Sequence, residues 1–188
     1  MYTWNARNQL ASIAGGTTAS FLYDGLGRRE NKIVGWSRTE FLFDGVNPVQ
    51  ETDGATILAN ILPGLRIDEI FTRSESAGTR SFLSDALGST LALTDSVGAV
   101  QTEYTYEPFG KTTASGEAST NSLQYTGREN DATGLYYYRA RYYHPGLQRF
   151  ISEDPWKCGH RKGRNLYAYG EAPGSEAPGS GMLYCYSV

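Results

Sequence analysis

Two aspartates are the residues of this sequence whose types and surroundings come nearest to supporting chemistry. Asp131 ends the segment Arg-Glu-Asn-Asp, and Asp154 lies in Glu-Asp-Pro. Two carboxylates that share one proton can act as general acid and general base. Each aspartate also has a structural interpretation, as a cap of a turn or strand end that contributes about 1 kcal/mol to stability. The sequence therefore offers Asp131 and Asp154 as weak catalytic candidates only.

The other reactive side chains form no catalytic or metal-binding pattern. Cys158 and Cys185 are the two cysteines, and their separation does not show whether they pair. Cys158-Gly-His160 has the look of a metal fragment, but zinc takes three or four protein ligands and no second ligand pair lies nearby in the sequence. The sequence has neither a nucleophile-elbow motif nor a glycine-rich phosphate loop. We expect no metal site and no cofactor.

A tyrosine-rich stretch must organise the elements around these aspartates. Residues 136–143 contain five tyrosines, and a single strand there would separate its side chains onto two faces. One face would hold Tyr136, Tyr138, Ala140 and Tyr142, and the other Leu135, Tyr137, Arg139, Arg141 and Tyr143. His144-Pro-Gly146 predicts a turn, with a return strand over residues 149–152. Exposed tyrosines could stack on sugars or bases, but this density favours cross-strand contacts within the sheet.

Composition limits the classes of protein to consider. A chain of 188 residues suffices for one ordinary domain with a core, and 22 glycines with 14 tyrosines suit many strands joined by turns. The net charge of −3 gives no general reason to expect a nucleic-acid partner. A small basic cluster around Arg161 is interpreted as a solvated loop. No apolar run approaches the length of a membrane span, and the N-terminal sequence lacks a signal-peptide pattern.

A degenerate unit recurs along the chain: aromatic, any residue, aromatic, acid or amide, then a turn residue. The residue before the acid or amide is Trp4, Tyr23, Phe43, Ser84 and Tyr106 in successive copies. The spacing of about 20 residues, doubled once, is typical of one β-hairpin per repeat. In each unit the acid starts a turn and glycine supplies the positive φ. The pattern predicts an all-β fold of antiparallel hairpins that stack into one curled sheet.

These motifs resemble those of a known family. Residues 125–143, then Arg149-Phe-Ile-Ser-Glu-Asp-Pro and Asn165-Leu-Tyr-Ala-Tyr, are similar to the Rhs-repeat-associated core. The recurring unit resembles the tyrosine–aspartate (YD) repeat of the same bacterial Rhs and teneurin-like shell proteins. The resemblance implies part of a hollow β-shell, which in Rhs proteins encloses a C-terminal toxin. It assigns YD-repeat hairpins to 1–124 and the core signature to 125–169, and it stops there. The tandem Glu-Ala-Pro-Gly-Ser repeat that follows predicts a divergent, disordered tail over 170–188.

The resemblance also implies a function. Some family members contain an aspartyl autoprotease that cuts after an Asp-Pro-x-Gly-Leu motif, but Gly170-Glu-Ala-Pro-Gly stands where that motif should begin. We therefore expect no enzyme, and a structural shell module without toxin cargo, since only 19 residues follow Tyr169. The alternatives are a self-cleaving core and a carbohydrate-binding or adhesion module. Family members are secreted or at the cell surface, but this sequence has no recognisable signal peptide or transmembrane segment.

The implied partners follow from the unfinished sheet. A shell segment needs the upstream part of a larger Rhs-type protein, and its toxin cargo is a second candidate partner. Unpaired edge strands favour self-association, with residues 2–10 expected to form the open edge. No nucleic acid and no membrane are expected as partners.

Overall fold

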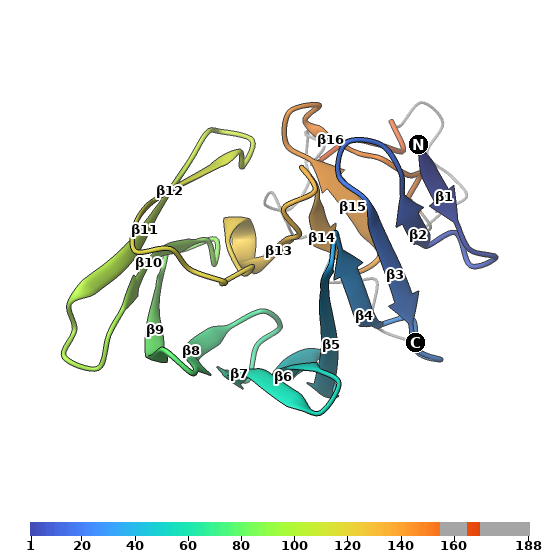
Figure 1. Cartoon of the computed structure of the whole chain (residues 1–188). Coiled ribbons are helices and arrows are strands. Elements are labelled where there is room, and N and C mark those ends of the chain that lie inside the picture. The colour runs from blue at the N-terminus through green and yellow to red at the C-terminus, as the bar shows by residue number, and fades with distance from the viewer. Residues whose placement is uncertain (155–164, 170–188) are drawn as a thin grey trace.

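The chain is built almost entirely from β-strands. The computed structural model describes residues 1–154 and 165–169, and its helical content there is a single 3₁₀ turn over Tyr125–Gly127 (Figure 1). The all-β prediction is confirmed. In the part of the chain that the structure describes, no helix has the length and apolar character needed to cross a membrane.

The first sheet contains 12 antiparallel strands, each paired with the next strand in the chain. This order is the repeated-hairpin arrangement that the sequence predicts. The strands are β1 (Tyr2–Trp4), β2 (Leu10–Ile13), β3 (Ala19–Tyr23), β4 (Arg29–Val34), β5 (Ser37–Asp44), β6 (Asn47–Asp53), β7 (Thr56–Pro63), β8 (Ile70–Glu75), β9 (Gly78–Ser84), β10 (Thr90–Thr94), β11 (Val100–Tyr106) and β12 (Thr112–Gly116).

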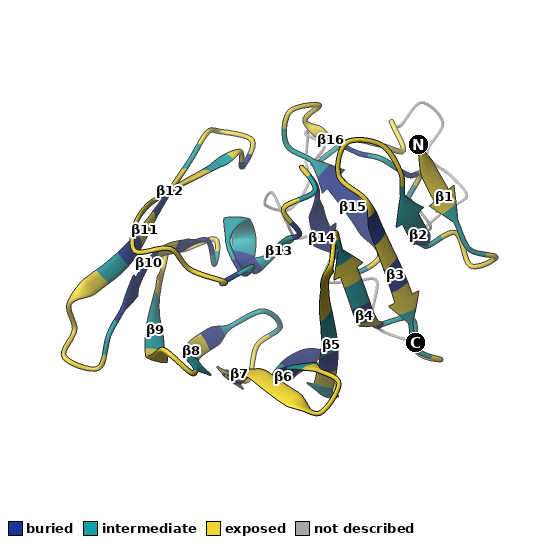
Figure 2. Ribbon diagram, viewed as in Figure 1, coloured by how far each residue is buried: buried dark blue, intermediate teal, exposed yellow. Residues whose placement is uncertain are grey.

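A second, four-stranded sheet lies within the curve of the first. Figure 1 shows β1–β12 following an open arc, with the second sheet beside β3 and β4. Its strands are β13 (Glu129–Asn130), β14 (Tyr136–Tyr138), β15 (Arg141–His144) and β16 (Arg149–Phe150). One core cluster joins the sheets, with Leu10 and Phe21 of the first packed against Leu135, Tyr137 and Tyr142 of the second. Buried residues accordingly concentrate on β14, β15 and alternate positions of β3 (Figure 2).

Four turns of the first sheet share one hydrogen-bond pattern, which an aspartate or asparagine side chain sets. Asn5, Asp24, Asp85 and Asp95 each use Oδ1 to accept the backbone N–H groups two and four residues later, at 2.7–3.0 Å. Three of the four belong to predicted repeat copies, and Asp95 forms the same turn outside them. Glu107 has a longer side chain, and its carboxylate pairs instead with Lys111 at 2.9 Å.

The tyrosine-rich stretch departs from the prediction of a single strand. It is a tight hairpin, in which β14 ends at Tyr138 and Arg139 has φ +58°. Tyr136 therefore pairs with Tyr143, and Tyr137 pairs with Tyr142. The predicted faces are wrong after Tyr138, because the turn places Tyr142 with Tyr137 rather than with Tyr136. The stretch has no glycine, asparagine or aspartate to signal positive φ.

Two other expectations can be compared with the structure. The turn predicted at His144-Pro-Gly146 is present, with the Leu147 N–H donating to the His144 carbonyl at 3.1 Å. The single open-edge strand expected over residues 2–10 is wrong: β1 ends at Trp4 and β2 begins at Leu10. The Asn5 turn intervenes, because its side chain accepts two backbone N–H groups. At this end of the sheet, the edge strand is therefore β1, without β2.

Two repeat copies with the same sequence pattern should respond differently to loss of their acid. We expect Asp24→Ala to lower the free energy of unfolding by about 1–2 kcal/mol, because two backbone N–H groups and Arg28 lose their acceptor. The Asp44 side chain is exposed, and no described residue donates a hydrogen bond to its carboxylate, so Asp44→Ala should change stability by less than about 0.5 kcal/mol. Urea unfolding of both variants measures the difference. Equal losses would contradict this account of the turns.

Candidate functional site

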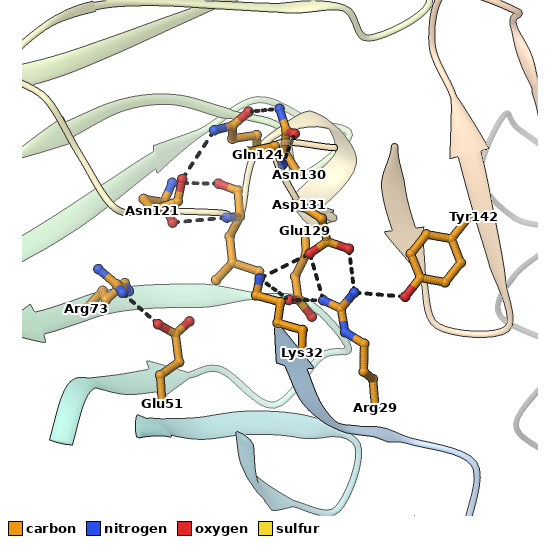
Figure 3. A network of polar contacts seen from close by, with 12 residues as sticks. Arg29, Lys32, Glu51, Arg73, Asn121, Gln124, Glu129, Asn130, Asp131 and Tyr142 are labelled. Carbon is orange, nitrogen blue, oxygen red and sulfur yellow. Dashed lines mark hydrogen bonds and ion pairs between the residues drawn. The ribbon is translucent and has the colours of Figure 1, made fainter. Parts of the chain in front are cut away.

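A buried cluster of charges connects the two sheets. Arg29 of β4 binds Asp131, which follows β13, through both of its terminal nitrogens; the Nη2–Oδ1 distance is 2.9 Å and Nη1 contacts Oδ2. Its Nη2 also donates to Glu129 Oε2 at 2.5 Å. The Lys32 ammonium group lies 3.1 Å from Asp131 and 3.3 Å from Glu129. Figure 3 shows these four side chains converging with the Tyr142 hydroxyl, which accepts from Arg29 at 3.0 Å.

The cluster is electrically balanced and shielded from solvent. The Arg29 and Asp131 side chains are 1% and 0% exposed, and two cations face two carboxylates. The guanidinium of Arg29 lies 4.0 Å from the centre of the Tyr137 ring, a cation–π contact. Burying an ion is costly, so a buried ion pair adds little net stability. Removal of one partner is strongly destabilising, because the other charge then stays buried without a counter-charge.

The cluster sets the protonation state of Asp131. Burial alone raises the pKa of Asp131, but the charges of Arg29 and Lys32 and their hydrogen bonds outweigh it and lower that pKa below its usual value. Asp131 is therefore ionised at neutral pH. Burial likewise raises the pKa of Tyr142 well above its usual value, so this hydroxyl stays neutral beside Arg29.

The two candidate aspartates lie in different surroundings. Asp154 is 32% exposed and pairs with Arg141 at 3.1 Å, whereas Asp131 is enclosed by Arg29 and Lys32. The capping interpretation of Asp131 is wrong, because the side chain that caps this turn is that of Asn130, which accepts the Ala132 N–H at 3.0 Å. The interpretation of Asp131 and Asp154 as weak catalytic candidates stays a prediction.

The tyrosines of the second sheet are internal. Tyr136, Tyr137, Tyr138, Tyr142 and Tyr143 are each at most 6% exposed, so these rings offer no open stacking face for sugars or bases. Residues 165–169 complete the packing of one face: Tyr169 lies 4.3 Å from Tyr143 between ring centres, and its hydroxyl is 2.8 Å from that of Tyr138.

Several sequence candidates cannot be placed. Cys158, His160, Cys185, the basic cluster around Arg161 and the tail over 170–188 lie outside the described residues. Within residues 1–154 and 165–169, no group of three or more histidine, cysteine, aspartate or glutamate side chains could hold a metal ion. His144 has a local role there, since its Nδ1 accepts the Leu147 N–H at 3.2 Å.

Sequence reasoning missed three of the four ions in the buried cluster. No local sequence pattern marks Arg29, Lys32 or Glu129 as part of a buried cluster. Arg29 directly follows Arg28, whose side chain pairs with Asp24 of its own turn at 2.7 Å, so the sequence does not show which arginine is buried. The contacts of Arg29 bridge 100 and 102 positions of sequence. A search for co-varying charged positions among related sequences could have found them.

Loss of the Asp131 charge should destabilise the fold strongly. We expect Asp131→Asn to lower the free energy of unfolding by about 3–5 kcal/mol, because Arg29 and Lys32 stay buried without a full counter-charge. Asp154→Asn, at a partly exposed pair, should cost about 1 kcal/mol or less. Urea unfolding at neutral pH measures both. Similar small losses would show that the cluster does not hold the sheets together.

The pH dependence of stability should report the same group. Because the pKa of Asp131 is lowered in the folded state, its stabilising contribution is complete above its unfolded pKa of about 3.9 and is lost as pH falls towards the folded pKa. The unfolding free energy of the wild-type chain should therefore fall more steeply below about pH 4 than that of Asp131→Asn. Parallel profiles would contradict this assignment.

Comparisons with known proteins bear on the identity of this fold. No protein-family model matches the chain. The chain is 32% identical over 181 residues to the tRNA3(Ser)-specific nuclease WapA of Bacillus spizizenii, covering 90% of the chain and 8% of that protein. It is 30% identical over 164 residues to double-stranded DNA deaminase toxin A of Burkholderia cenocepacia, covering 83% of the chain and 11% of that protein.

A solved structure gives the same result for the fold. The crystal structure of TcdB2-TccC3-Cdc42 superposes with a TM-score of 0.70 and 27% sequence identity, over 89% of this chain and 9% of that one. The chain thus spans only about a tenth of the length of each relative.

These relatives overturn one prediction. The expectation of no enzyme is wrong, because relatives across most of the chain are named as a nuclease and a deaminase toxin. That expectation came from the missing self-cleavage motif, which has no bearing on the activity of a toxin. The repeated hairpins in a curled sheet, the core signature and these relatives together show that the chain belongs to the Rhs-repeat shell family of toxin proteins.

Proposed function

We propose that this chain is the closing segment of a β-shell within a larger Rhs-type toxin protein. Its hairpins form part of the wall of the shell, and the second sheet covers one end of the strands in that wall. The observation that supports this proposal most strongly concerns the turns of the first sheet. When antiparallel strands pair in sequence order, all turns that follow odd-numbered strands lie at the same end of the strands.

The segment 126–143 contacts four of these turns. Each contact joins the second half of the chain to the loop between an odd strand and the next even strand. They are Arg139 with the Val46 carbonyl, Arg139 with Asp68, the Thr126 N–H with Ser89 Oγ at 3.1 Å, and the Tyr143 hydroxyl with the Phe109 carbonyl at 3.0 Å. Contacts to four successive loops support a second sheet that covers one end of the strands of the wall, rather than a separate domain beside the wall.

The two ends of the first sheet support a partner in the same protein. Among the described residues, β1 and β12 each pair with one neighbouring strand, so the backbone N–H and C=O groups on the other side of each are open to a further strand. A further strand of an upstream shell portion would satisfy those groups. The relatives, which are roughly ten times longer than the chain, support a larger protein of this kind.

The names of the relatives favour a shell that belongs to an enzymatic toxin. The names of the nuclease and the deaminase give tRNA and double-stranded DNA as what they act on, and we propose an enzymatic toxin as the cargo of the whole protein here as well. The narrower prediction, a shell without cargo, stays a prediction. No observation favours a carbohydrate-binding function, since the tyrosines of the second sheet are buried.

A segment exchange tests the proposal. The 181-residue matching segment of the Bacillus spizizenii nuclease would be replaced by this chain. We expect the hybrid to resist limited proteolysis as its parent does, with β1 amides that exchange more slowly than in the isolated chain, because a neighbouring strand now pairs with β1. A hybrid that is cleaved within the insert, while the isolated chain resists the protease, would contradict a shell function.

The isolated chain should associate through its edges. We expect Tyr2→Lys and Thr113→Lys, on edge strands β1 and β12, to reduce self-association measured by sedimentation velocity, because a charge on an edge opposes strand pairing. Ile57→Lys adds the same charge at an exposed position of the internal strand β7 and serves as the control. A wild-type chain that stays monomeric, or an equal effect of the control, would contradict the open edges.

A further inference from the structure

A small cavity lies between the segment 126–143 and the strands and loops of the first sheet. Its volume is about 20 Å³, and four arginines line it: Arg28, Arg29, Arg128 and Arg139. Asp68 and Glu129 are the carboxylates in its wall. The cavity lies beside the buried cluster of Figure 3, with which it shares Arg29 and Glu129.

The ion pairs among the described residues give these arginines fewer carboxylates than guanidinium groups. Arg28 is neutralised by Asp24, and the Arg29 cluster has equal numbers of cations and carboxylates. Arg128 and Arg139, in contrast, both pair with the single carboxylate of Asp68. Among the described ion pairs, the cavity wall is therefore richer in guanidinium than in carboxylate groups.

Two of the lining guanidinium groups also have an N–H donor that lacks an acceptor among the described residues. The Nε atoms of Arg29 and Arg128 are buried and have no hydrogen-bond partner among the described residues. Arg29 is 1% exposed as a residue, and the Arg128 side chain is 13% exposed. A buried, charged N–H without an acceptor is costly, so an acceptor near these atoms would stabilise the fold.

We propose that this cavity binds one small monovalent anion of the size of chloride, held by Arg128 and Arg29. Arginine offers donors and no acceptor, so a ligand that only accepts suits this wall. A cavity of about 20 Å³ has room for a particle of about the size of one water molecule. Phosphate and sulfate, with five heavy atoms each, are too large for it.

The bound anion would stabilise the contact between the two sheets. Arg29 belongs to the first sheet and Arg128 precedes β13 of the second. An anion between them would accept hydrogen bonds from two guanidinium groups that come from different parts of the chain. It would therefore hold the second sheet against the wall, and it would bind the folded state only.

Anion-dependent unfolding tests the site. We expect the urea midpoint of the wild-type chain to rise with sodium chloride, relative to sodium gluconate at the same ionic strength, because gluconate is too large for the cavity. Once chloride exceeds the dissociation constant, the folded-to-unfolded ratio should rise about in proportion to its concentration. Arg128→Gln should lose this chloride response. Arg80→Gln, which removes an arginine paired with Glu117 outside the cavity, should keep it.

A second measurement keeps the test decisive if Arg128→Gln does not fold. Wild-type crystals soaked in sodium bromide should show an anomalous peak within hydrogen-bond reach of Arg128 and Arg29. Equal midpoints in chloride and gluconate, together with no bromide peak in the cavity, would overturn the proposal and leave water as its occupant.

Discussion

The pairing of Arg29 with Asp131 is the interaction on which the relative position of the two sheets depends. A guanidinium and a carboxylate that are both almost fully buried are tolerable only when they face each other. Arg29 lies on β4 and Asp131 just beyond β13, so the pair forces the second sheet into the curve of the first. Lys32 and Glu129 complete a neutral group, and Tyr137 and Tyr142 both contact Arg29.

The aromatic residues supply the nonpolar part of the same junction. The second sheet buries both of its faces: Tyr137 and Tyr142 pack on the first sheet, and Tyr136, Tyr138 and Tyr143 pack on Phe150 and Tyr169. A tight turn at Arg139 makes this division possible, because it reverses the chain between Tyr138 and Tyr142. Arg139 in turn contacts the Val46 carbonyl and Asp68 in two loops of the first sheet. Tertiary contacts thus support a conformation that the local sequence does not favour.

The hairpins of the first sheet were predictable because their causes are local. A period of two in the strands and an acid with glycine in the turns act over fewer than ten residues, and the Asp24 and Asp85 turns have the expected hydrogen bonds. The hairpin at Arg139 was not predictable, since its positive φ depends on loops some 70 to 90 positions earlier. The same holds for Asp131: its partner Arg29 lies 102 positions away. The capping role expected of Asp131 belongs to its neighbour Asn130.

A double-mutant cycle on Arg29 and Asp131 tests the central claim most directly. Arg29→Met and Asp131→Leu would be made singly and together, and the free energy of unfolding measured by urea for all four chains. The account predicts that each single change costs about 3–5 kcal/mol, and that the double change costs less than their sum by more than about 1 kcal/mol, because the second change removes an unpaired buried charge. Costs that add to within about 0.5 kcal/mol would mean that the two residues act independently and that the pair does not join the sheets.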